Sequence, residues 1–173
     1  WFNPTINSYK RINAPVTASG ATWAPNTITY SGNNRTHMIR VPGPGRFELR
    51  LMDGATNPYL LQAGILAAGI DGMEKKRNPG KPINVNMYEE GHKVKGAKKL
   101  PLSLEKALSH LSKSQVMKDA FSKETIDSYI KLKNKEIKKY QSSNTKKIGF
   151  KGSKQSAKKN IITQWEKDNT LDC

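Results

Sequence analysis

The fold of this chain is decided by the stretch Thr36-His37-Met38-Ile39-Arg40-Val41-Pro42-Gly43-Pro44-Gly45-Arg46-Phe47-Glu48-Leu49-Arg50-Leu51. Residues 36–41 and 46–51 have the composition and the alternation of β-strands. The Pro-Gly-Pro-Gly segment at residues 42–45 is a strong turn signal between them. We therefore predict an antiparallel hairpin.

Side chains alternate across a strand, so Arg46, Glu48 and Arg50 are predicted to share one face of the second strand. Arg40 joins that face if the loop holds an odd number of residues, which pairs Met38 with Glu48. With an even loop, Arg40 points to the opposite face. The chemistry of the hairpin therefore depends on its register.

A strand face that carries several arginines around one carboxylate has two explanations. A surface ion-pair ladder is common and stabilises a protein only weakly. The alternative is a binding site, because guanidinium groups in excess of their acidic partners suit an anionic substrate such as a phosphate or a carboxylate. In such a site Glu48 could bind a hard divalent metal ion that also contacts phosphate oxygens.

Helices are predicted to follow the hairpin. Asn57 and Pro58 have the residue types of a helix cap and a first helical position, and this helix is expected to run to about Lys76. Further helices are predicted from Ser103 to Leu111, from Val116 to Phe121 and along Ile126 to Tyr140, with a final short one over Ile161–Asp168. Loops with short extended pieces are expected over residues 1–35, and loops over residues 81–101.

The predicted fold class is α+β, with an antiparallel β-sheet and packed α-helices in one domain of 173 residues. Residues 1–56 form its strand-rich part and residues 57–173 its helical part. Residues 142–160 contain six lysines and no acidic residue, and their Ser, Gly, Asn and Gln content favours a flexible basic loop.

The formal net charge of +16 arises from 30 basic and 14 acidic residues. Five of the six arginines lie within the first 50 positions, whereas the remaining basic residues are lysines apart from Arg77. Arginine suits bidentate recognition of anions, and exposed lysine mainly adds solubility. A nucleic-acid-binding module is the alternative, but residues 142–160 offer only Phe150 for base stacking and no known motif.

The lone cysteine, Cys173, excludes an internal disulfide and a cysteine-based metal cluster, so a reducing, cytoplasmic location is predicted. No stretch approaches the roughly 18–20 apolar residues that a membrane span needs. His37, His92 and His110 show no ligand spacing and are interpreted as structural or exposed residues.

Several motifs together resemble the C-terminal catalytic region of glutamine synthetases. They are Asn7-Ser8-Tyr9-Lys10-Arg11, Gly32-Asn33-Asn34-Arg35-Thr36-His37-Met38-Ile39-Arg40-Val41-Pro42, Arg46-Phe47-Glu48-Leu49-Arg50, Asp53-Gly54-Ala55-Thr56-Asn57-Pro58-Tyr59-Leu60 and Ala67-Ala68-Gly69-Ile70-Asp71-Gly72. The resemblance is dense from residue 3 to residue 80. Beyond it, Met87-Tyr88-Glu89 and Trp165-Glu166 look most like the branch that includes glutamate–methylamine ligases.

The resemblance implies ATP-dependent formation of a γ-glutamyl amide from glutamate and ammonia through γ-glutamyl phosphate, with Mg²⁺ or Mn²⁺. It assigns catalytic roles to Arg35 and Arg50, and binding of the glutamate substrate to Arg11, Arg35 and Arg50. It further implies ATP binding by Arg35, Arg40 and Arg46, and metal binding by Glu48. The parent enzyme would be a large homo-oligomer of stacked rings.

Two departures from the family pattern have consequences. The family usually has a glutamate before the Ala-Pro that follows the Tyr-Lys-Arg motif, whereas Trp23 precedes Ala24-Pro25 here. An apolar wall at Trp23 would favour methylamine over ammonia, and a core position for Trp23 is the alternative. The family's N-terminal β-domain and most of its metal ligands are expected to precede this chain, so the isolated chain is predicted to lack ligase activity.

Overall fold

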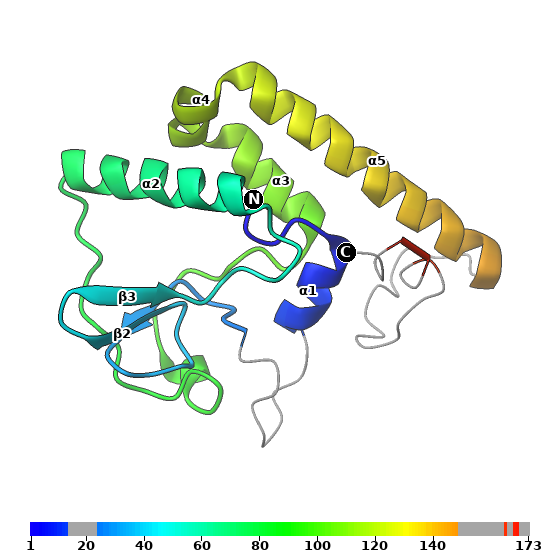
Figure 1. Cartoon of the computed structure of the whole chain (residues 1–173). Helices are drawn as coiled ribbons and strands as arrows, with labels where there is room; N and C mark the ends of the chain where they lie inside the picture. Colours follow the sequence, from blue (N-terminus) through cyan, green and yellow to red (C-terminus); the bar gives the residue numbers. More distant parts are fainter. Residues whose placement is uncertain (14–23, 149–164, 166–167, 170–173) are drawn as a thin grey trace.

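The predicted hairpin is present in the computed structural model, which describes residues 1–13, 24–148, 165 and 168–169. It consists of β2 (Ile39–Gly43) and β3 (Arg46–Leu49), which pair antiparallel. A short strand, β1 (Tyr30–Ser31), pairs parallel with β2 and gives the strand order β1-β2-β3. The sheet is therefore mixed, with the antiparallel hairpin as its larger part (Figure 1).

The register of the hairpin places Arg40 opposite Glu48 and Ile39 opposite Leu49. The prediction that Met38 pairs with Glu48 was wrong by two residues. A shift of two leaves every side chain on its predicted face, because the side-chain period of a strand is two. Arg40 consequently does share a face with Glu48. The pairing shifts between Arg40 and Gly43, which is an irregularity that the sequence did not indicate.

The first helix, α1 (Ile6–Asn13), corrects the expectation of loops over residues 1–35. Its start is capped by Thr5 and Ser8, each of whose backbone N–H groups donates to the other's hydroxyl, at 3.1 and 3.2 Å. Such reciprocal bonds satisfy N–H groups that the first turn leaves without helical partners. The apolar side chains of Tyr9 and Ile12 are buried, so tertiary packing outweighs the polar composition of the segment.

The second helix, α2 (Pro58–Glu74), confirms the predicted start at Asn57. The side chain of Asn57 accepts from the backbone N–H groups of Tyr59 and Leu60, at 3.0 and 3.1 Å. The helix ends two residues before the predicted Lys76, which lies in the left-handed region with a φ of 47°. Apolar side chains lie on all sides of α2.

The remaining helices are α3 (Leu104–Lys113), α4 (Gln115–Phe121) and α5 (Lys123–Ile148), at the three places where the sequence predicted them. Ser103 caps α3 as its side chain accepts from Lys106 N–H at 3.3 Å. Residues 81–101 are loops as predicted, apart from the 3-10 turn η1 (Gly91–Lys93). No helix in the described part of the chain is long and apolar enough to span a membrane.

The predicted flexible loop at residues 142–160 is wrong in its first part, because α5 continues to Ile148. Lysine, serine and asparagine do not break a helix by themselves, and α5 is simply longer than its apolar spacing indicated. Residues 149–160 lie outside the described residues, as does Trp23. Of the predicted helix over Ile161–Asp168, only Trp165 and Asp168 are described, and both are helical.

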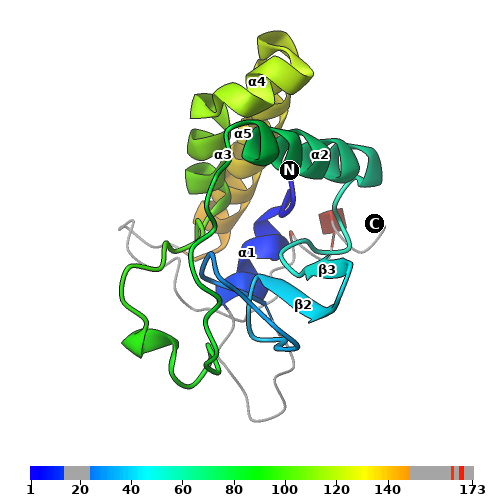
Figure 2. The ribbon, with the colours of Figure 1, turned by 90° about the vertical axis from the view of Figure 1, so that its left-hand side faces the viewer.

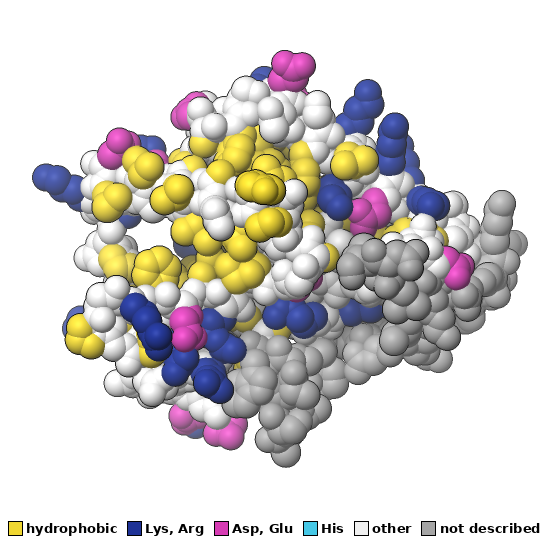
Figure 3. Space-filling model, viewed as in Figure 1, with side chains coloured by type: hydrophobic (Ala, Val, Ile, Leu, Met, Phe, Trp, Pro, Cys, Tyr) yellow, Lys and Arg dark blue, Asp and Glu magenta, His cyan; other side chains and the backbone are white. Residues whose placement is uncertain are grey.

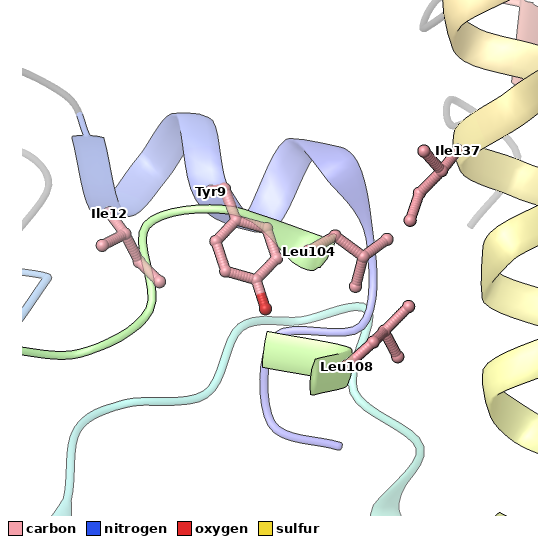
Figure 4. Packing of buried hydrophobic residues seen from close by; sticks show 5 residues of the cluster. All are labelled: Tyr9, Ile12, Leu104, Leu108 and Ile137. Atoms are coloured by element: carbon pink, nitrogen blue, oxygen red, sulfur yellow. The ribbon is translucent and has the colours of Figure 1, made fainter. Parts of the chain in front are cut away.

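The hydrophobic core joins three helices that are far apart in the sequence. Tyr9 and Ile12 of α1 pack with Leu104 and Leu108 of α3 and Ile137 of α5 (Figure 4). Helices α2 to α5 lie on one side of the hairpin, and α1 lies close to it (Figures 1 and 2). The arrangement leaves the hairpin at one edge of the helical layer.

Candidate functional site

The centre of the candidate site is an ion pair between the two hairpin strands. Arg40 Nη1 donates to both carboxylate oxygens of Glu48 at 2.8 Å. The Arg40 side chain is 13% exposed and that of Glu48 39% exposed, so the carboxylate remains accessible to a ligand. The bond from Arg40 holds the pKa of Glu48 below its ordinary value, and the charges of Arg46 and Arg50 act in the same direction.

Arg50 extends the cluster beyond the end of β3. Its backbone N–H donates to Met38 O at 2.8 Å, and its Nη1 donates to the backbone carbonyl of Arg35. Partial burial lowers the pKa of the Arg50 guanidinium, and the nearby charges of Arg35 and Arg40 lower it further. Such crowding of like charges favours an anionic ligand, because an anion relieves the repulsion.

Arg11 reaches the cluster from α1. Its Nη2 donates to Leu51 O at 2.6 Å and to Asn3 Oδ1 at 3.2 Å, which fixes the guanidinium beside the end of the hairpin. Its Nε is buried and has no hydrogen-bond partner among the described residues. Burial lowers the pKa of Arg11, and the charge of Arg50 contributes to this shift.

Tyr88 also belongs to the candidate site, although sequence reasoning gave it no role. Its phenol interacts electrostatically with both Arg11 and Arg50. Burial raises the pKa of Tyr88, and the two arginines oppose that shift. The Met87-Tyr88-Glu89 motif was a signal for this residue, but nothing in the sequence placed it beside arginines that are far away along the chain.

A hydrogen-bond network fixes the segment that carries Tyr88. His37 is fully buried between Thr29 Oγ1 and the carbonyl of Val85, each 3.0 Å from a ring nitrogen. Met87 N–H donates to Thr36 Oγ1 at 2.9 Å. This arrangement confirms the structural interpretation of His37. His92 and His110 are exposed, also as predicted.

The described residues contain no group of three His, Cys, Asp or Glu side chains that could hold a metal ion. Glu48 is accessible and has two carboxylate oxygens, which are suitable ligands for a hard divalent cation. It can therefore supply one ligand of a metal site whose other ligands come from elsewhere, such as phosphate oxygens. The donor set of the described residues fits such a shared site and does not form a complete one.

The structure brings together the residues that the sequence singled out. The hairpin carries Arg40, Arg46 and Glu48, and Arg50 directly follows β3. The carbonyl of Arg35 supports Arg50, and Arg11 approaches from α1. A space-filling view shows basic side chains gathered around an acidic one below α2 (Figure 3). The described residues thus form an α+β fold whose surface carries guanidinium groups in excess of one carboxylate, an arrangement that suits an anionic ligand.

Comparisons with known proteins identify the family. The family model described as glutamine synthetase, catalytic domain, matches residues 1–149. The glutamine synthetase of Rhizobium leguminosarum bv. phaseoli is 53% identical over 170 residues, covering 98% of this chain and 35% of that protein. The glutamate–methylamine ligase of Methyloversatilis universalis is 45% identical over 140 residues, covering 79% of this chain and 31% of that protein.

A solved GmaS/ADP complex, in its conformation 1, matches with a TM-score of 0.76 and 48% identity, covering 99% of this chain and 35% of that one. This match confirms the α+β fold. The chain belongs to the glutamine synthetase family. It spans about 35% of the length of the first curated relatives that it matches.

Proposed function

We propose that this chain supplies the arginine-rich part of the active site of an ATP-dependent ligase. The reaction would join glutamate and ammonia into glutamine. The observation that carries the proposal is the Arg40–Glu48 pair, with Arg46 on the same hairpin and Arg50 directly after it. Family membership supports this type of reaction.

The chemistry proposed for the whole protein has two steps. An oxygen of the glutamate γ-carboxylate attacks the γ-phosphorus of ATP, and the bond to ADP breaks to leave γ-glutamyl phosphate. The nitrogen of ammonia then attacks the acyl carbon, phosphate leaves with the bonding electron pair, and the nitrogen loses a proton. The first step brings two anions together, and in the second step negative charge develops on the leaving phosphate. Fixed guanidinium groups can stabilise both steps where that charge develops.

The roles proposed for the individual residues are those that the family resemblance implies. Arg11 would hold the glutamate carboxylate, and the phosphates of ATP would be contacted by Arg35, Arg40 and Arg46. Arg35 and Arg50 would also bind glutamate, Arg35 would contact the phosphoryl group during its transfer, and Arg50 would stabilise the acyl phosphate. Glu48 would supply one ligand of a Mg²⁺ or Mn²⁺ ion, and the charge of that ion would offset the charge of the phosphates.

The test uses the whole protein that carries this chain, assayed for glutamine formation from glutamate, ATP and ammonia. Arg50→Ala is expected to lower kcat by about 10²–10³, the magnitude found when a group that stabilises a developing charge is lost. Arg77→Ala is the matched control, because Arg77 pairs with Asp71 at 2.7 Å on α2 rather than with the cluster. Absence of glutamine formation by the unmodified protein would contradict the proposal.

A second candidate acceptor is methylamine, which would give γ-glutamylmethylamide. It is favoured by the match to the GmaS structure over 99% of this chain and by the 45% identity to a glutamate–methylamine ligase. Ammonia and methylamine should be compared side by side in one assay. A kcat/KM at least tenfold higher for methylamine would select this candidate, and a higher value for ammonia would exclude it as the main activity.

The assembly and location of the whole protein are also proposals. The single cysteine favours a cytoplasmic location. We expect a homo-oligomer, as the family resemblance implies, and no ligase activity from the isolated chain. Light scattering on the whole protein checks the first expectation. Glutamine formation by the 173-residue chain alone would contradict the second.

A further inference from the structure

The guanidinium of Arg40 is held from two sides by two chemically different acceptors. Glu48 accepts from Nη1 with both carboxylate oxygens. On the other side, the amide oxygen of Asn33 accepts from Nε at 2.9 Å and also from Nη2. The Glu48 carboxylate is charged and can bind a cation, whereas the Asn33 amide oxygen is neutral.

Asn33 lies in a turn, residues 32–35, that the rest of the fold holds in place. Gly32 O accepts from Val41 N–H at 3.1 Å, which joins the turn to β2. The side chain of Asn34 donates to Val85 O at 3.0 Å and accepts from Thr36 N–H at 3.0 Å. The turn is thus anchored on both sides of Asn33, although the side chain of Asn33 itself is exposed.

The same turn also supports a second arginine of the cluster. The backbone carbonyl of Arg35 accepts from Arg50 Nη1. Arg40 and Arg50 are therefore both oriented by neutral oxygens from residues 32–35. A neutral acceptor fixes a guanidinium without cancelling its positive charge, whereas a second carboxylate at either position would weaken the attraction for an anion.

We infer that Asn33 is a positioning residue that keeps the Arg40 guanidinium directed toward an anionic ligand. The inference rests on the proposed function and concerns the phosphate groups of its nucleotide. Glu48 alone cannot serve this purpose, because a cation that binds its carboxylate competes with Arg40 for the same oxygens. Asn33 holds Nε and Nη2 whatever Glu48 binds.

The experiment is a double-mutant cycle in the whole protein, with binding of ATP and of inorganic tripolyphosphate measured by calorimetry. Asn33→Ala is expected to weaken binding about tenfold when Arg40 is present, which corresponds to one lost charge-assisted hydrogen bond. In the Arg40→Ala background the same change is expected to cost less than about twofold, since coupled residues are not additive. Equal losses in both backgrounds, or no loss in either, would overturn the inference.

Asn33→Asp separates charge from shape, because aspartate keeps the oxygen acceptor at nearly the same size. It is expected to leave the melting temperature unchanged and to weaken tripolyphosphate binding at least threefold. Asn26→Asp is the matched control, since it makes the same charge change at another exposed asparagine, which accepts from Thr27. Asn33→Asp binding as tightly as the control would contradict the role of a neutral acceptor.

The outcomes distinguish the inference from the proposed function. If the whole protein forms no glutamine but Asn33 and Arg40 show coupled binding of tripolyphosphate, the proposed reaction fails and the positioning role stands. If glutamine forms and the two residues are independent, the positioning role fails alone.

Discussion

At Glu48, neighbouring arginines hold the pKa of the carboxyl below its ordinary value of 4.5. Because the folded pKa is lowered, the stabilisation from the Arg40–Glu48 pair is fully present above pH 4.5 and is lost as the pH falls through the folded value. Arg40→Ala removes the first cause of the shift and should bring the pKa back toward 4.5. Carbon-13 NMR titration of the glutamate side chains checks this, and an unchanged Glu48 titration would contradict the observed pairing.

At His37, burial lowers the pKa of the imidazole from its ordinary value of 6.5. The unfolded chain then binds a proton more readily than the folded chain does. The stabilising contribution is therefore complete above pH 6.5 and decreases as the pH falls below it. We expect urea unfolding to show this loss as the pH falls below 6.5, and His37→Gln to reduce the dependence of the unfolding free energy on pH. Equal slopes in the two proteins would assign the pH dependence to another group.

The residues of the site differ in how far the sequence alone predicts them. Alternation along one strand was enough to place Arg46, Glu48 and Arg50 on a common face. Arg11 came only from the family resemblance, because its bond to Leu51 spans 40 positions of the sequence. Tyr88 was missed for the same physical reason, since no local pattern encodes a contact between distant segments.

At the scale of the elements, α2 contains a glycine that its packing requires. A Cβ at Gly64 would lie 2.8 Å from Cδ1 of Trp1, whose ring is itself packed edge-on against Phe121 and Tyr129. Gly64→Ala should therefore destabilise the protein by about 1–3 kcal/mol, as expected for overpacking.

A matched control lies on the same helix. A Cβ at Gly69 would meet nothing within 4 Å, so Gly69→Ala should stabilise the protein by about 0.5–1 kcal/mol through helix propensity. Urea unfolding measures both changes. Shifts of the same sign would show that packing against Trp1 does not constrain this helix.

The elements were predictable where local signals agree. Asn57 and Pro58 mark the start of α2, and Ser103 marks that of α3, because each cap acts through the adjacent turn. Helix α1 was missed, since its short polar sequence becomes helical through the burial of Tyr9 and Ile12 against distant residues. The predicted length of α5 was too short, because composition does not determine where a helix ends.

At the scale of the whole molecule, exposed apolar side chains coexist with a net charge of +16. Tyr59, Leu66 and Met73 of α2 are 81%, 63% and 72% exposed, and Phe47 of β3 is 61% exposed. Figure 3 shows apolar side chains spread over α2 and the surface beneath it. Apolar patches promote association, whereas like charge opposes it.

We therefore expect the isolated chain to associate as salt is added. The electrostatic screening length falls from about 10 Å at 0.1 M salt to about 3 Å at 1 M, which removes most of the charge repulsion between molecules. Leu66→Gln combined with Met73→Gln should reduce this association in light scattering. Gln62→Asn is the control, because Gln62 is also an exposed residue of α2 and the change leaves its polar character unaltered. Equal association of the double variant and the control would exclude α2 as the contact surface.

The bonds from residues 31, 36 and 37 to residues 84–87 cross about fifty positions of the sequence, with separations of 53, 51 and 48. They close a loop that contains the whole hairpin and α2. Closing such a loop lowers the entropy of the chain before the stabilising contacts form. Contacts between residues that are distant in the sequence therefore slow folding. We therefore expect the arginine surface to form late in folding, after the local helices.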